Sequence, residues 1–170
     1  LKFKVNRYGN EAEIDGQGRI GNTTADGNGP WMRSVEAQVI EGGVGDFILV
    51  AGFDEHGRRL APRLTARAGQ DRDGEAVFDA SAEAREFESG RINWFGRDAD
   101  WQDRLGFRGR QDVESPYGEW TRLEVIADGD RLTNIVNGKM VNQGYRSSLT
   151  EGRILIQSEG AEIYVRRIDV

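Results

Sequence analysis

The residues best suited to chemistry lie in two short stretches of the first third of the chain. Ser34 to Ile40 reads SVEAQVI, and a strand alternates its side chains, so Glu36 and Gln38 point to one face and the apolar residues to the other. The turn GGVGD ends on Asp46, directly before the apolar stretch FILVA. A carboxylate held beside a buried strand can act as a general base. Glu36 and Asp46 are therefore candidate catalytic residues, and Gln38 is a candidate substrate contact.

Each carboxylate also has a structural interpretation. Glu36 and Gln38 could form the solvent-exposed side of an antiparallel strand. Asp46 could form an Asx-type turn, in which its carboxylate accepts backbone N–H groups.

The pattern Glu36-x-Gln38-x-x-Glu41 is similar to the ExDxxE strand of concanavalin-like glucanases, with an amide in place of the middle acid. On a regular strand Glu36 and Glu41 lie on opposite faces, and they could cooperate only across a bulge. A retaining pair needs its carboxyl groups about 5 to 5.5 Å apart. Ordinary glycosidase chemistry therefore ranks second.

Residues 91–117 form a second candidate region. The segment has no clear periodicity, is longer than structural loops usually are, and interleaves aromatic residues with arginines and aspartates. Aromatic faces stack on sugar rings and arginine supplies forked donors, so Trp94, Trp101 and Arg108 are candidate substrate contacts. The same residues could instead pack the loop down as a small core closed by Arg–Asp pairs. His56, the only histidine, reads as an exposed hairpin tip without a catalytic role.

Composition limits the function classes. Only 37% of the residues are apolar and 31% are charged, but the apolar ones cluster in alternating runs, which indicates a globular chain. A formal charge of -6 and a pI near 5.0 argue against a nucleic-acid partner and are compatible with a neutral sugar. No run reaches the roughly 18 to 20 apolar residues of a membrane span. The absence of cysteine excludes disulfides and thiolate metal sites.

The alternating runs predict an all-β chain. Asp128-Gly129 and Asn137-Gly138 are two-residue hairpin turns, since these residues tolerate positive φ. Residues 80–88 are good helix formers with one large apolar residue, and we expect a marginal helical turn there. Residues 6–30 are expected to form a surface loop. The predicted strands are 1–5, 34–40, 47–51, 63–67, 76–78, 119–127, 131–136, 139–143, 153–157 and 161–169.

Three motifs, in this order, resemble one family. They are WMRSVEAQVIEGGVGDF at 31–47, RINWFGRDADW through GFRGRQDVESPYGEW at 91–120, and GRILIQSEGAEIYVRRIDV at 152–170, which follows an Asn-Gly hairpin. Together they resemble the 3-keto-disaccharide hydrolase domain. The resemblance implies a concanavalin-like jelly-roll sandwich of two antiparallel sheets, with residues 1–170 as a single domain that acts on oxidised sugars. It also implies export to the periplasm or cell surface. Relatives carry a further opening segment, so we expect the N-terminal strands to be missing or divergent.

The same resemblance implies a mechanism. A ketone at C3 acidifies the C2 proton of the sugar, so a base can remove it, the anomeric substituent leaves, and water adds back. The route needs a base, a stabiliser for the enolate oxygen and a proton donor. Glu36 or Asp46 could be the base. A divalent cation (Ca²⁺ or Mg²⁺) in an all-oxygen site, Arg108 or Arg166 could hold the enolate, and no cofactor is required by the sequence.

The closing strands supply two further candidate contacts. Glu159 lies at a turn, and Arg166 on the last strand could reach Glu36 or Glu159, either for substrate binding or as a structural ion pair. Two other functions remain open, a non-catalytic carbohydrate-binding module and a conventional glycoside hydrolase. The oligomeric state is left open.

Overall fold

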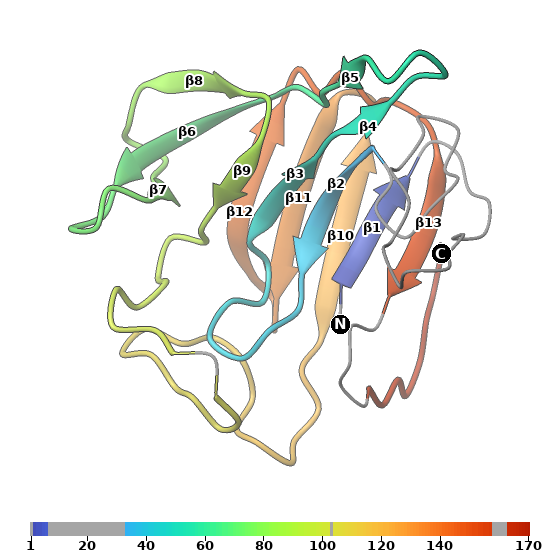
Figure 1. Ribbon diagram of the computed structural model, residues 1–170. Helices are drawn as coiled ribbons and strands as arrows, with labels where there is room; N and C mark the ends of the chain where they lie inside the picture. Colours follow the sequence, from blue (N-terminus) through green and yellow to red (C-terminus); the bar gives the residue numbers. More distant parts are fainter. Residues whose placement is uncertain (1, 7–32, 103, 158–162) are drawn as a thin grey trace, which may run out of the picture.

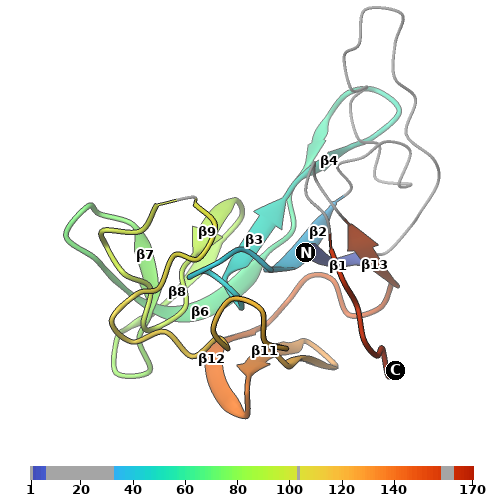
Figure 2. The same cartoon turned by 90° about the horizontal axis from the view of Figure 1, so that it is seen from below.

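Two antiparallel sheets face one another in an all-β jelly-roll sandwich (Figure 1). The computed structural model describes residues 2–6, 33–102, 104–157 and 163–170, and these residues contain no helix. Figure 2 shows the two layers, with β11 and β12 on one side and β1, β2 and β3 on the other. The five-stranded sheet runs in the order β13 (Arg153–Gln157), β1 (Lys2–Asn6), β2 (Ser34–Gln38), β3 (Phe47–Val50) and β9 (Gly90–Ile92).

The second layer is a six-stranded sheet. β8 (Ala84–Phe87) pairs with β6 beside the main path, and a separate hairpin joins β4 (Gly52–Phe53) to β5 (Arg59–Leu60). The main path of the six-stranded sheet is β10 (Leu123–Asp128), β11 (Arg131–Val136), β12 (Lys139–Tyr145), β6 (Leu64–Gln70) and β7 (Ala76–Phe78).

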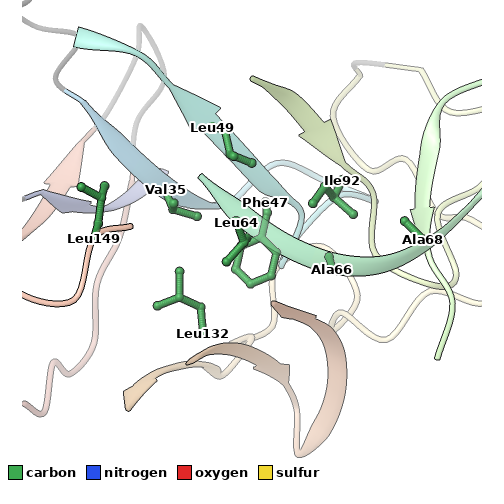
Figure 3. Close-up of a cluster of buried hydrophobic side chains, with 9 residues drawn as sticks. All are labelled: Val35, Phe47, Leu49, Leu64, Ala66, Ala68, Ile92, Leu132 and Leu149. Carbon is green, nitrogen blue, oxygen red and sulfur yellow. The ribbon is translucent and has the colours of Figure 1, made fainter. Parts of the chain in front are cut away.

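The main core fills the space between the layers. Period-two alternation turns Val35 of β2 and Phe47 of β3 inward, where they join Leu64 of β6 and Leu132 of β11 (Figure 3). Within the six-stranded sheet, Leu64 of β6 packs closely on the backbone of β12 at Gly144, where a Cβ would lie 2.7 Å from the Leu64 side chain. The core packing fixes which face of β2 is left for chemistry.

A second buried cluster lies toward the loop end of the sandwich and contains Val44, Trp94, Val136 and Val141. The register between β11 and β12 shifts at Asn134/Ile135, and this bulge lets both Val141 and Asn142 point inward. The buried amides of Asn134 and Asn142 donate to the carbonyl oxygens of Gly45 and Ile92. These bonds tie the two sheets together across the sandwich.

Most predicted strands are confirmed, as are both hairpin turns, where Asn137, Gly138 and Gly129 have positive φ. The predicted helical turn at 80–88 is wrong, because residues 84–87 form β8 and Phe87 pairs with Leu64 and packs on the core. Pairing with β6 overrides the helix propensity of this run.

The last predicted strand, 161–169, is also wrong over its described part. Residues 163–170 have no strand, and Tyr164, Val165 and Ile168 are exposed. Alternation shows that a segment could bury one face, but it does not supply a neighbouring strand to pair with. The predicted loop at 6–30 lies almost entirely outside the described residues.

Candidate functional site

The outward face of β2 carries buried polar groups. Val35 and Ala37 belong to the core, so alternation turns Glu36 and Gln38 to the side of the five-stranded sheet that faces away from its partner sheet. Glu36 is 0% exposed and Gln38 is 4% exposed. The solvent-exposed interpretation of these two residues is therefore wrong. Burying a carboxylate costs free energy. Glu36 lies on the face of β2 opposite the hydrophobic core, so core packing does not explain why it is buried.

Strand pairing places an arginine on the same row as Glu36. Glu36 pairs with Ile48 on β3, and Ile48 pairs with Arg91 on β9. Two strand spacings, about 9.5 Å, separate the backbones of Glu36 and Arg91. The side chain of Arg91 is 34% exposed. A carboxylate and a partly accessible guanidinium thus flank Ile48 on one face of the sheet.

Asp46 lies at the end of the same face and is 0% exposed. One carboxylate oxygen accepts the backbone N–H of Trp94 at 2.7 Å, and the other lies 2.6 Å from the Arg97 guanidinium and 3.8 Å from that of Arg91. Burial raises the pKa of Asp46 to about 6, and the nearby Arg97 opposes that rise. The Asx-turn interpretation is wrong, because the N–H donor comes from 48 residues away.

The loop after β9 is pinned onto the turn that precedes Asp46. The indole N–H of Trp94 donates to the Gly42 carbonyl at 3.0 Å, and that of Trp101 donates to the Glu41 carbonyl at 2.6 Å. The guanidinium of Arg97 lies over the Trp101 ring, 4.1 Å from its centroid. Trp94 is buried, and for this residue the structure shows the packing alternative, whereas Trp101 stays half-buried.

Two more glutamates serve the same turn. Glu114 accepts the N–H of Val44 at 3.1 Å, and burial raises its pKa to about 7. Glu41 accepts the N–H of Phe107 at 3.1 Å. The role of Glu114 could not be predicted from the sequence, because its partner lies 70 residues away and no local motif marks it.

The glycines of the turn permit this close approach. A Cβ at Gly43 would lie 2.1 Å from the guanidinium of Arg97, and one at Gly42 would lie 2.7 Å from the Phe107 ring. Gly45 has φ +93, and a Cβ there would lie 2.3 Å from Val141. The sequence GGVGD is therefore required by the loop that packs on it.

A hollow of about 250 Å³ opens beside the loop, and we call it the loop hollow. Its lining includes Arg97, whose guanidinium also holds Asp46. Arg72 pairs with Asp100 at its rim. Glu36 and Asp46 do not line it, and the hollow is connected to the outward face of β2 through Arg97, whose guanidinium binds Asp46. The other charged or polar residues of its wall are Asp98, Arg110 and Gln111.

Comparison with known proteins identifies the family. A family model described as a 3-keto-alpha-glucoside-1,2-lyase-like domain matches residues 14–170. The chain belongs to this family. No curated protein and no solved structure matches it. Membership supports a carbohydrate-processing hydrolase or lyase in the broad sense.

The remaining predicted contacts of this lyase-like domain are scattered. Arg108 donates to the Glu114 carbonyl at 2.8 Å and helps to close the loop. Arg166 is exposed in the irregular segment 163–170, and Glu159 lies outside the described residues. The hairpin-tip prediction for His56 is confirmed, since it is exposed between β4 and β5.

Metal binding by this lyase-like domain stays a prediction. Among the described residues, no three His, Cys, Asp or Glu side chains gather closely enough to hold a metal ion. Within the same part of the chain, no helix is long and apolar enough to cross a membrane.

Proposed function

We propose that the chain cleaves the glycosidic bond of 3-keto-glucosides, with Glu36 as the base that removes the C2 proton. The observation that carries the proposal is a fully buried carboxylate on the outward face of the five-stranded sheet, on one row with Arg91. Family membership supports the substrate class. A sugar ring bound over Ile48 would have the Glu36 carboxylate on one side as a base and the Arg91 guanidinium on the other side as a cation.

The chemistry assigns one role to each group. Glu36 takes the C2 proton, and the electrons move to the C3 oxygen, where the guanidinium of Arg91 stabilises the enolate. The C1–O bond then breaks, and the aglycone oxygen takes the proton that Glu36 removed from C2. Water adds across the C1–C2 double bond, with hydroxyl on C1 and hydrogen on C2, so the net reaction is hydrolysis.

Asp46 is the weaker candidate for the base because of what its carboxylate already binds. Both oxygens of Asp46 are engaged, one by the Trp94 N–H and one by Arg97. Asp46 therefore acts as a positioning residue that holds Arg91 and Arg97, and it is the second candidate for the base. Glu36 is closed to solvent, so substrate entry must open this face, and closure over the sugar then excludes bulk water while leaving room for the one water that adds to C1.

The test compares three variants on a 3-keto-glucoside. Glu36→Gln keeps the shape but removes the base, so kcat should fall by about 10²- to 10⁴-fold with KM little changed. Glu55→Gln, on the exposed β4–β5 hairpin, is the matched control and should leave kcat unchanged. Asp46→Asn should lower the free energy of unfolding, and it should reduce kcat less than Glu36→Gln does. Full turnover by Glu36→Gln would remove Glu36 from the mechanism.

The two alternatives give different outcomes in the same assay. Cleavage of the unoxidised glucoside would support a conventional glycoside hydrolase, which ranks second because Glu41 is engaged by the Phe107 N–H. Binding without turnover of either sugar would support a carbohydrate-binding module. Loss of turnover on addition of a chelator would indicate that a divalent cation, and not Arg91, stabilises the enolate.

A further inference from the structure

A second hollow, of about 300 Å³, lies on the six-stranded sheet, and we call it the sheet hollow. It forms between β11, β12, β6 and β7, where β6 and β12 share only a short stretch of pairing (Figure 1). We propose that the sheet hollow binds a saccharide that carries an anionic group, independently of the cleavage site. Its wall includes Arg67, Phe78, Arg131, Met140, Gln143 and Tyr145.

The β-bulge in β12 shapes this hollow. Because Val141 and Asn142 both point inward, Met140 and Gln143 both point outward, and Tyr145 follows on the same side. Bulges often re-aim side chains next to functional sites. The amide of Gln143 donates to the Thr133 hydroxyl oxygen at 3.1 Å. This bond holds the side chain in place and leaves its carbonyl oxygen free to accept a hydroxyl of the ligand.

The charge of the wall selects an anion. The hollow is lined by Arg67 and Arg131 and by no carboxylate, although the chain as a whole carries a formal charge of -6. Arg67 uses one guanidinium nitrogen on the Ala82 carbonyl and keeps its other donors. Within the described part of the chain, Arg131 forms no ion pair with a carboxylate. Two guanidinium groups with unused donors match a carboxylate or a sulfate.

The apolar part of the wall selects a sugar ring. Tyr145 is half-buried and presents a ring, Met140 is exposed on a paired strand, and Phe78 closes the wall. Aromatic and apolar faces beside a few polar donors are typical of small-ligand sites. A small inorganic anion would leave this apolar surface unused, whereas the C–H face of a pyranose covers it. An acidic saccharide can contact both the two arginines and the apolar side chains of the sheet hollow.

The experiment titrates the whole chain by isothermal calorimetry with three oligosaccharides of equal length: a galacturonate oligomer, a sulfated oligomer and a neutral gluco-oligomer. We expect saturable binding of at least one acidic oligomer, at least ten-fold tighter than the neutral one and weakened by added salt. A preference between the two acidic oligomers identifies the group as carboxylate or sulfate. Equal binding of all three, or no binding of either acidic oligomer, would overturn the proposal.

Variants locate the binding. Arg131→Gln and Tyr145→Ala should each weaken binding of the acidic oligomer by ten-fold or more. Arg122→Gln, which removes an exposed arginine that pairs with Glu124, is the matched control and should change nothing. Arg131 is exposed at a hairpin, so its variant should fold even if Tyr145→Ala does not. Unchanged affinity in Arg131→Gln would contradict the assignment. Glu36→Gln should keep this binding, which separates the result from the proposed cleavage.

Discussion

Glu36 and Asp46 are two fully buried carboxylates on one face of one sheet, yet they are held in different ways. Asp46 gives both oxygens to the loop, through the Trp94 N–H and Arg97, and so it joins two distant parts of the chain. Glu36 is placed by the ladder between β2 and β3, on a row that leads to Arg91. Burial of an acid is therefore not a sign of chemistry by itself. For Asp46, these two contacts make stability the property that its loss should affect most.

The largest expected effect on stability is at Asp46. Asp46→Ala leaves Arg97, whose side chain is only 4% exposed, without its counter-charge. Breaking a buried pair in this way costs about 3 to 5 kcal/mol, measured by urea unfolding. Glu36→Gln should change the same quantity less than Asp46→Ala does, because the isosteric amide keeps the size of the side chain. Equal losses of unfolding free energy in the two variants would show that Glu36 and Asp46 contribute equally to stability.

The turn that carries Asp46 should be nearly as sensitive. Gly45→Ala places a methyl group 2.3 Å from Val141 at a φ of +93, so we expect a loss of about 1 to 3 kcal/mol from overpacking together with backbone strain. The control is Gly57→Ala, which has φ +75 but open space around it, and it isolates the backbone contribution. If both variants unfold at the same denaturant concentration, the close approach of β12 does not constrain the turn.

The pH dependence of stability should come from the loop region. The pKa of Glu114 rises from 4.5 to about 7 on folding, so the folded state binds more protons than the unfolded state between those values. Stability is then fully present below about pH 4.5 and falls as the pH rises to about 7, by at most about 1.4 kcal/mol per pH unit. Asp46, raised from 3.8 to about 6, adds a fall of the same sign.

Glu114→Gln tests this origin of the pH dependence. The amide still accepts the Val44 N–H but cannot ionise, so the slope of unfolding free energy against pH should flatten between pH 4.5 and 7. Thermal melts at a series of pH values measure it. An unchanged slope in the variant would show that Glu114 does not titrate in this range.

The smallest expected effect is at Trp101. Trp101→Phe removes the indole donor to the Glu41 carbonyl, and the unfolding free energy should fall by about 0.5 to 1.5 kcal/mol. Phenylalanine keeps an aromatic face, so KM for the 3-keto-glucoside should hold. A raised KM with unchanged stability would instead make Trp101 a substrate contact rather than a loop anchor.

Much of the fold could be predicted from local patterns. Alternation located β2 and β3, and Asn137-Gly138 located the β11–β12 hairpin, because these features depend on neighbouring residues alone. The two errors, at 80–88 and 161–169, concern whether a partner strand lies alongside. That depends on long-range pairing, which a single sequence does not display.

Only the local features of the site could be predicted from the sequence. The alternation of β2 separated Glu36 from the core face, but not its complete burial or its row with Arg91, which needs the register of three strands. The long-range partners of Asp46 and Glu114 were likewise hidden, since Arg97 and Val44 are 51 and 70 residues away from them. Aromatic and arginine residues in the loop suggested sugar binding, whereas several of them form its packing.

The most direct test of Glu36 as the base follows the hydrogen on C2. Cleavage of a 3-keto-glucoside is run in D₂O, and the released sugar is examined by NMR at early times, with an enzyme-free sample to correct for spontaneous exchange. We expect deuterium at C2 with the unaltered protein, and we expect Glu36→Gln to slow both cleavage and C2 exchange by about 10²- to 10⁴-fold. Protium retained at C2 in the product, or C2 exchange by Glu36→Gln at the rate of the unaltered protein, would contradict it.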